Sequence, residues 1–237
     1  ACAKHFAAYG AAVGGRDYAE ADISEHTLQQ VYLPPFQAAV EAGVATFMNA
    51  FNEINGIPAT AHKILQRDVL KGKWGFKGFV VSDYNSVEEL VNHRYAADKK
   101  DAAAKALNAG LDMEMVSTCY LTYLKELVQE GKVKESVLDD AVRCILEKKY
   151  ELGLFEDPFR YCNPERAARI LNAPEVRNAS LRMAERSVVL LENRESVLPL
   201  DGTDEEDSLD RRTLKIPIRY GRRLGRHYGP EQSGDLV

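Results

Sequence analysis

The sequence lacks the features that mark several common classes of protein. Its four cysteines form no C-x-x-C pair, so zinc and dithiol redox sites are unsupported, and we expect no metal or other cofactor. No run of about 18 apolar residues occurs, so no membrane span is predicted. A basic excess is also missing: the net charge is -5 over 237 residues, which argues against a nucleic-acid partner.

What the chain does contain is an ordinary globular composition, with 45% hydrophobic and 28% charged residues. Short apolar runs alternate with amphipathic segments, which predicts an α/β fold in which helices cover a parallel sheet. We expect strands at residues 1–6, 46–51, 79–81 and 111–113, and helices at 24–42, 62–71, 102–109, 120–129 and 136–152. Four strand–helix units correspond to about half of an eight-stranded (β/α)8 TIM-type barrel.

Polar side chains follow each of the four expected strands. They are Lys4 and His5, Asn49 and Asn52, Asp83, and Asp112. Asp83 ends the apolar run Gly78-Phe79-Val80-Val81, and in a βα barrel the carboxyl ends of the strands form the active-site face. This pattern favours a functional carboxylate at Asp83. The alternative is an Asp that caps a helix or turn, because Asp is common after strands.

The alternation of short apolar runs with amphipathic segments ends after Leu154. Residues 155–200 contain Asp157-Pro158 and Asn163-Pro164, which indicate a linker. A helix at 174–186 and a strand at 187–191 then open a second α/β domain. Residues 201–237 remain unassigned and are expected to be a disordered tail. The chain begins without Met in what reads as the middle of a strand, which predicts that it starts inside a domain.

Several segments together resemble glycoside hydrolase family 3, in particular the bacterial β-glucosidases. They occur in the family's order and cover about residues 1–200: 3–6 (AKHF), 14–18 (GGRDY), 31–36 (VYLPPF), 48–58 (MNAFNEINGIP), 74–84 (WGFKGFVVSDY), 109–113 (AGLDM) and 191–200 ending in LPL. The resemblance implies the C-terminal half of the family's barrel at residues 1–154. It also implies a periplasmic or extracellular location, which the chain itself leaves open.

The resemblance implies a retaining exo-β-glycosidase that releases terminal β-D-glucosyl residues through a covalent glycosyl-aspartate. Asp83 falls on the nucleophile, and Lys4 and His5 fall on the pair that holds hydroxyls of the terminal sugar. An oxocarbenium-like transition state needs a carboxylate on one face of the sugar, and nearby cations favour the ionised form of that carboxylate. The expected partner is therefore a β-glucoside or an oligosaccharide.

Three further residues are assigned to substrate binding by the same resemblance. Tyr84 follows the nucleophile where the family more often has Trp, a residue that stacks on the sugar in the leaving-group subsite. Phe51 stands where some members have Tyr near the nucleophile, so a hydroxyl contact to Asp83 is absent here. Met48 begins the same segment and is included among the substrate-binding residues.

No general acid/base is predicted in this chain, so we expect low activity. In the family it is commonly a Glu in the second domain, beyond the Leu-Pro-Leu segment where the resemblance ends. One branch uses a His on the loop after the Lys-His pair, but residues 14–18 contain none. Glu53 is a carboxylate near the same strand ends and is therefore considered as a general acid. For this residue, a structural contact with the turn at Asn55 is favoured.

Two other functions are considered. A non-catalytic carbohydrate-binding or self-assembling half-barrel is the main alternative, because half a barrel has open sheet edges that a dimer would close. A phosphate-handling, aldolase-like barrel is disfavoured. The sequence has no Gly-rich phosphate loop before a late helix and no Lys in the middle of a strand.

Overall fold

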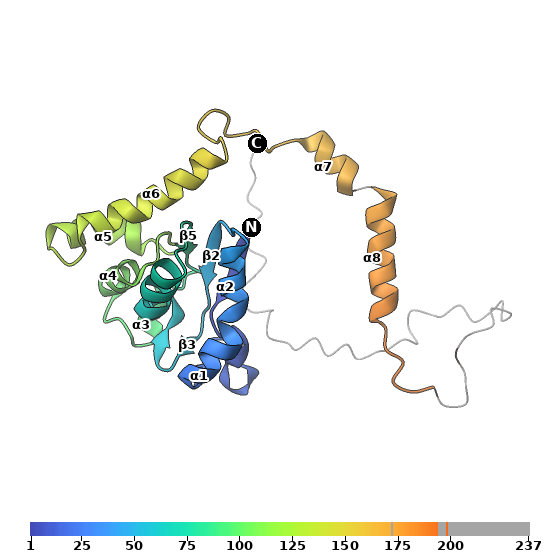
Figure 1. The fold of residues 1–237 in the computed structure, drawn as a ribbon, viewed down its shortest axis with the longest axis horizontal. Coiled ribbons are helices and arrows are strands. Elements are labelled where there is room, and N and C mark those ends of the chain that lie inside the picture. The colour runs from blue at the N-terminus through green and yellow to red at the C-terminus, as the bar shows by residue number, and fades with distance from the viewer. Residues whose placement is uncertain (172, 194–197, 199–237) are drawn as a thin grey trace, which may run out of the picture. The chain divides into compact units, whose positions relative to one another are not determined.

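The computed structural model describes residues 1–171, 173–193 and 198. They belong to two units, Ala1–Pro164 and Glu165–Val237, each taken by itself below. The first unit is built on a parallel three-stranded sheet in the order β1-β2-β5 (Figure 1). Its strands are β1 (Cys2–Phe6), β2 (Thr46–Asn49) and β5 (Phe79–Val81). Their carboxyl ends therefore share one edge of the sheet.

The connection from β1 to β2 is helical, as a parallel crossover requires. Two short 3-10 turns, η1 (Tyr9–Ala11) and η2 (Val13–Gly15), come first, and α1 (Glu25–Thr27), a π-helical turn η3 (Leu28–Tyr32) and α2 (Pro34–Glu41) follow. Ser24 caps α1, since its hydroxyl accepts a hydrogen bond from the Thr27 amide at 3.1 Å. The predicted division of this helix at the two prolines is confirmed, because α2 begins at Pro34.

The connection from β2 to β5 contains a small hairpin and a longer helix. The hairpin pairs β3 (Glu53–Ile54) with β4 (Ile57–Pro58). A 3-10 turn, η4 (Ala59–Ala61), leads to the π-helix η5 (Ile64–Lys73). The expected helix at 62–71 is therefore present, but with wider hydrogen bonding than in an α-helix.

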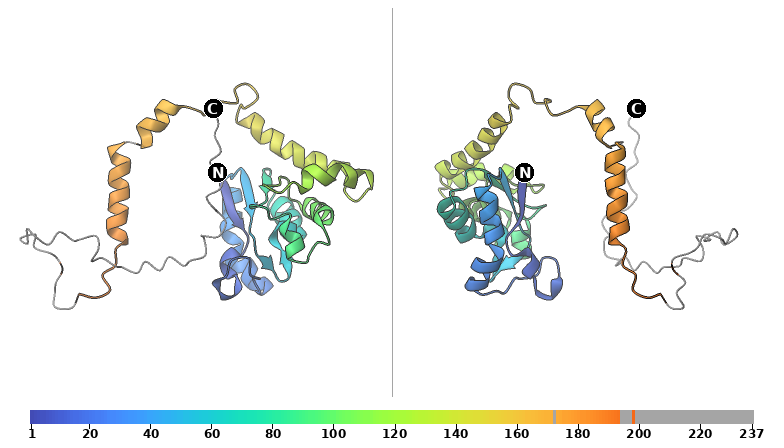
Figure 2. Two further views of the ribbon diagram at one scale, coloured as in Figure 1. Left: turned by 180° about the vertical axis from the view of Figure 1, so that it is seen from behind. Right: turned by 45° about the vertical axis from the view of Figure 1, so that its right-hand side comes forward.

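Within the first unit, four helices lie between β5 and Pro164. They are α3 (Glu89–Asn92), α4 (Lys99–Ala109), α5 (Cys119–Gln129) and α6 (Glu135–Glu151) (Figures 1 and 2). Gly110 ends α4 with a φ of 112°, a conformation that favours glycine. The strand expected at 111–113 is reduced to a single parallel bridge between Val81 and Met113. The prediction of a short fourth strand at 111–113 was therefore wrong.

Aromatic rings form the core between the sheet and its helices. Phe6 and Phe47 are almost completely buried, with ring centroids 5.5 Å apart, and Phe47 packs edge-on against Phe76 at 4.9 Å. Gly78 precedes β5 and lies against the carbonyl oxygen of Ala45, where no side chain has room. Burial of one phenylalanine ring in this core contributes about 1.5–3 kcal/mol to the stability of the fold. This core holds the three strands in their places.

In the second unit, the described part contains α7 (Pro164–Leu171) and α8 (Pro174–Ser187). The helix predicted at 174–186 is therefore confirmed. The strand predicted at 187–191 is wrong: α8 runs through Ser187, and residues 188–191 form no strand. A strand needs a neighbour to accept its hydrogen bonds, and none of the described segments pairs with this one. The tail assigned to 201–237 lies outside the described residues.

Candidate active site at the strand ends

The edge formed by the strand ends brings two of the predicted residues together. His5 lies near the end of β1, and Asp83 lies on the loop after β5. The Nε2 atom of His5 is 3.3 Å from Oδ2 of Asp83, although the two strands are separated by β2 in the sheet. The geometry therefore places an imidazole beside the carboxylate.

The two oxygens of Asp83 have different surroundings. Oδ1 accepts a hydrogen bond from the backbone amide of Tyr84 at 2.6 Å. Oδ2 is buried and accepts no hydrogen bond from the described residues, because His5 lies at an ion-pair distance but not in hydrogen-bond geometry. The side chain as a whole is only 12% exposed. One oxygen is thus fixed by the backbone, and the other retains its capacity to interact.

Ser82 fixes the loop that carries Asp83. Its hydroxyl donates to the Asp83 carbonyl at 2.9 Å and accepts from the Met115 amide at 2.8 Å. Its own amide donates to the Met113 carbonyl at 2.9 Å. Sequence reasoning gave Ser82 no role, although a small hydroxyl residue just before a candidate nucleophile was a usable signal.

Tyr9 supports the other side of His5. The two rings meet edge-on with centroids 5.2 Å apart, and the Tyr9 hydroxyl donates to Asp17. Burial raises the pKa of Tyr9, and the hydrogen bond to Asp17 raises it further, so the phenol stays neutral. The sequence analysis did not single out Tyr9.

The remaining predicted site residues lie around this pair with different exposures. Lys4 is exposed and pairs with no carboxylate among the described residues. Met48 lies on β2 opposite Val81, at a half-buried position. Tyr84 is 61% exposed, which leaves its ring open to a ligand. Among the described residues, no hydrogen bond, ion pair or ring contact joins Lys4, Met48 or the Tyr84 ring to Asp83, so their roles stay predictions.

Phe51 belongs to an aromatic cluster with two residues of the loop after β1. Its ring lies 4.7 Å from that of Tyr18 and 6.3 Å from that of Tyr9. Burial raises the pKa of Tyr18, with smaller contributions from Glu89, Asp17 and Asp83. Phe51 therefore belongs to an aromatic wall that includes Tyr9, whose ring packs on the His5 imidazole beside Asp83.

Glu53 is held in a structural pair. Its Oε1 atom lies 2.7 Å from Nδ1 of His93, and both side chains are largely buried. Asp112 is also occupied, since Oδ1 binds Lys71 at 2.5 Å and Oδ2 accepts from the Val80 amide at 2.8 Å. Both carboxylates are therefore engaged within the fold, and the partner of Glu53 is His93 rather than the turn at Asn55.

A small cavity adjoins this region. Its volume is about 340 Å³, and it is lined by Tyr18, Glu89, Asn92 and His93. Burial raises the pKa of Glu89; His93 lowers it, and Asp83, Asp17 and Glu88 raise it. Sequence reasoning missed Glu89, because no motif marks it beyond its place shortly after the Asp83 loop.

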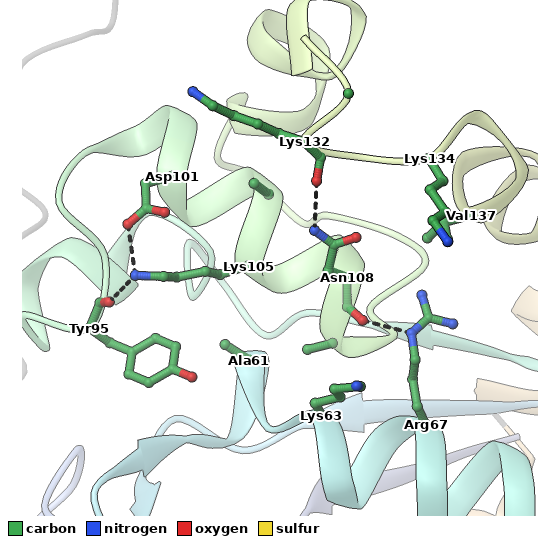
Figure 3. A pocket seen from close by; sticks show the side chains of 13 residues that line it. Ala61, Lys63, Arg67, Tyr95, Asp101, Lys105, Asn108, Lys132, Lys134 and Val137 are labelled. Carbon is green, nitrogen blue, oxygen red and sulfur yellow. Dashed lines mark hydrogen bonds and ion pairs between the residues drawn. The ribbon is translucent and has the colours of Figure 1, made fainter. Parts of the chain in front are cut away.

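A second cavity, of about 700 Å³, carries five basic side chains (Figure 3): Lys63, Arg67, Lys105, Lys132 and Lys134. Part of this charge is engaged within the protein. Arg67 donates to the Asn108 carbonyl at 2.7 Å, and Lys105 binds Asp101 at 2.8 Å. Asp83 does not line this cavity, so we assign it no part in the candidate active site.

Two kinds of feature are absent from the part of the chain that the structure describes. There, no three His, Cys, Asp or Glu side chains group together as metal ligands would. None of the helices in that part of the chain is long and apolar enough to cross a bilayer.

Comparison with known proteins gives consistent matches. Residues 1–147 match the family model described as "Glycosyl hydrolase family 3 N terminal domain". The periplasmic beta-glucosidase of Salmonella typhimurium is 44% identical over 200 residues, which are 83% of this chain and 26% of that protein. A putative beta-xylosidase of Formosa agariphila is 37% identical over 207 residues, 85% of this chain and 27% of that protein.

The fold is also similar to solved structures. The beta-glucosidase from Listeria innocua in complex with glucose matches with a TM-score of 0.75 and 45% identity. The match covers 84% of this chain and 27% of that one. The chain thus spans about a quarter of the length of the relatives that it matches.

Proposed function

Since the chain belongs to glycosyl hydrolase family 3, we propose that it carries the nucleophile side of a retaining exo-β-glycosidase site. In this proposal Asp83 attacks the anomeric carbon of a terminal β-D-glucosyl residue. Lys4 and His5 bind hydroxyls of that sugar, while Tyr84, Phe51 and Met48 contribute to substrate binding. The relatives named above include both a beta-glucosidase and a beta-xylosidase, so glucosyl preference is part of what we propose.

The observation that carries the proposal is the unequal pair of oxygens on Asp83. Oδ1 is held by the Tyr84 amide, whereas Oδ2 is buried beside His5 with no hydrogen-bond donor among the described residues. A nucleophilic carboxylate needs a fixed orientation and one oxygen free to form a bond. The hydrogen bond to Oδ1 supports the first requirement, and the lack of a hydrogen bond at Oδ2 supports the second.

The reaction proceeds in two displacements. Oδ2 forms a bond to the anomeric carbon as the bond from that carbon to the leaving oxygen breaks, and the electron pair stays on the leaving oxygen. Water then attacks the same carbon, the bond from that carbon to Oδ2 breaks with its electron pair to restore the carboxylate, and the proton that water loses passes to the solvent. We assign no acid/base, because Glu53 is already bound to His93. Protonation of the leaving group contributes about 10²–10⁴-fold, so we expect this chain to act mainly on activated leaving groups.

Trapping the glycosyl-enzyme tests this proposal. The chain is incubated with 2,4-dinitrophenyl 2-deoxy-2-fluoro-β-D-glucoside, whose leaving group needs no proton, and intact mass and peptide mapping locate the adduct. We expect one fluoroglucosyl group on Asp83 and none in Asp83→Asn. The corresponding 2,4-dinitrophenyl 2-deoxy-2-fluoro-β-D-xyloside is tested in the same way. The ratio of the two trapping rates gives the preference between glucosyl and xylosyl groups. A folded wild-type chain that acquires no adduct would refute the nucleophile assignment.

A second function is supported by the free edge of the sheet. Strand β1 pairs with β2 on one side and has no neighbour on the other among the described strands. Such an edge offers unpaired backbone groups to another strand. We therefore also propose self-association, which light scattering measures. A monodisperse dimer supports it, and a monomer at all concentrations argues against it.

We further propose a periplasmic or extracellular location. The Salmonella relative, named as periplasmic, supports it. Cell fractionation of the source organism with antibody detection provides the test, and recovery in the cytoplasmic fraction alone would refute it.

A further inference from the structure

The basic cavity, which η5, α4 and the start of α6 line in the first unit, has no part in the proposed reaction (Figure 3). Its volume of about 700 Å³ lies within the range of small-molecule sites, which is about 300–1,000 Å³. Five cationic side chains line it, and Asp101 is the one carboxylate among the described residues that do so. The chain as a whole has a net charge of -5, so this local excess has the opposite sign.

Only part of the positive charge in the basic cavity is neutralised within the protein. Lys105 lies 2.8 Å from Asp101, and Lys132 lies 2.9 Å from Glu130. The other cations of the cavity pair with no carboxylate among the described residues; they are Lys63, Arg67 and Lys134. Like charges that line one cavity repel each other, so an anion that enters it is attracted by all of them.

Arg67 is already held in place for such an anion. Its Nε atom donates to the Asn108 carbonyl at 2.7 Å, and Nη2 donates to the Leu107 carbonyl at 2.9 Å. A Cβ atom at Gly110 would lie 3.0 Å from Cγ of Arg67, so the glycine leaves room for this arrangement. Neither bond uses Nη1, which remains available to a ligand. Because the guanidinium is fixed beforehand, little side-chain entropy is lost on binding.

We propose that the basic cavity binds the diphosphate group of a small soluble ligand, with Lys63, Arg67 and Lys134 as its cationic partners. A guanidinium binds phosphate oxygens through its N–H groups in a fixed geometry, and lysines add mobile point charges. A single phosphate group carries about -1.5 to -2 at pH 7, which is less than the charge of three unpaired cations. Two joined phosphate groups match that charge. Asp83 does not line this cavity, so the inference is independent of the proposed glycosidase function.

Calorimetry on the whole chain, in buffer without divalent cations, provides the test. Sodium pyrophosphate, inorganic phosphate and ADP are the ligands. We expect the wild type to bind pyrophosphate about tenfold more tightly than phosphate, and to bind it more weakly as NaCl rises from about 50 mM to about 500 mM. ADP carries the same diphosphate on an organic group, so its affinity relative to pyrophosphate distinguishes an organic diphosphate from the free anion.

Two double variants with the same change in charge separate a defined site from general attraction. Lys63→Gln/Lys134→Gln removes two of the proposed partners, and we expect it to weaken pyrophosphate binding about tenfold or more. Lys125→Gln/Lys149→Gln is the matched control, because both lysines are exposed and neither lines the cavity. This control should retain the wild-type affinity.

Three results would overturn the inference. They are a folded wild-type chain that binds no pyrophosphate, equal affinities for phosphate and pyrophosphate, and an equal loss of binding in the two double variants. Circular dichroism verifies folding. Lys63 and Lys134 are both exposed, so we expect their substitution to leave the fold intact. If the double variant does not fold, the single variant Lys134→Gln is compared with Lys125→Gln instead.

Discussion

The imidazole of His5 lies 3.3 Å from Oδ2 of Asp83, the carboxyl oxygen that has no hydrogen-bond donor among the described residues. The contact joins the first strand of the sheet to the loop after its last one. It also gives the proposed nucleophile a polar neighbour on the side opposite the Tyr84 amide.

Replacing His5 should slow the trapping of Asp83. Without the imidazole, both the carboxylate and the sugar hydroxyls lose a polar partner, so we expect His5→Ala to reduce the rate of adduct formation about tenfold. Rates come from intact mass spectra taken over time with the fluoroglucoside. His26→Ala serves as the control, because His26 is exposed and remote in sequence. Equal rates in the wild type and His5→Ala would contradict a role for this contact.

Tyr84 should influence the leaving group more than the carboxylate. Its ring is 61% exposed, and an aromatic contact contributes about 0.5–1.5 kcal/mol. We expect Tyr84→Ala to slow trapping by the dinitrophenyl reagent several-fold and Tyr84→Trp to restore or exceed the original rate. In 2-deoxy-2-fluoroglucosyl fluoride the leaving group is fluoride, which has no ring for Tyr84 to stack on. The rate of trapping by this reagent should therefore stay unchanged in Tyr84→Ala. An equal loss with both reagents would argue against stacking.

Acidification should destabilise the fold through His62. Burial lowers the pKa of His62, so the folded state keeps this side chain neutral while the unfolded state takes up a proton near pH 6.5. Stability is therefore lost as pH falls below about 6.5, by at most about 1.4 kcal/mol per pH unit. Urea unfolding at about pH 7.5 and about pH 5.5 measures this.

The variants His62→Gln and His26→Gln separate His62 from other titrating groups. Only His62→Gln should reduce the difference between the two pH values, since His62 is buried and His26 is exposed. A pH dependence that survives in His62→Gln would assign the effect to another residue.

Gly78 should tolerate no side chain. A Cβ atom there would collide with the Ala45 carbonyl oxygen and lie 2.5 Å from Cζ of Phe76. We expect Gly78→Ala to lower the free energy of unfolding by about 1–3 kcal/mol or more, because the backbone must shift. Gly10→Ala is the matched control, as a Cβ at Gly10 meets nothing within 4 Å. Similar unfolding curves for the two variants would contradict this account.

The strands of the sheet were predictable because their residues are apolar and their ends are polar. The run from Gly78 to Val81 is short, β-rich and followed by a carboxylate, and parallel strand ends share an edge. The approach of His5 to Asp83 follows because each residue lies at the end of a strand and the strand ends share that edge. The ring of Tyr9 behind His5 was not predictable, since it depends on how the loop after β1 turns back.

Other features depend on contacts between residues distant in sequence, which no local pattern encodes. Asp112 was expected at the polar edge, yet Lys71 and the Val80 amide bind its carboxylate. The β-branched run Val188-Val189 favours a strand locally, but no described segment pairs with it. Glu89 is half-buried only because α3 turns its first residue toward Tyr18 and His93.

The hydrogen bond from residue 84 to Asp83 comes from the main chain, while the side chain of the same residue faces outward. Every amino acid except proline supplies that N–H group. Residue 84 can therefore exchange its ring without disturbing the orientation of the carboxylate beside it. In the site that we propose, a single position thus separates two properties, so that preference for the departing group can drift over evolutionary time while the geometry of attack is preserved.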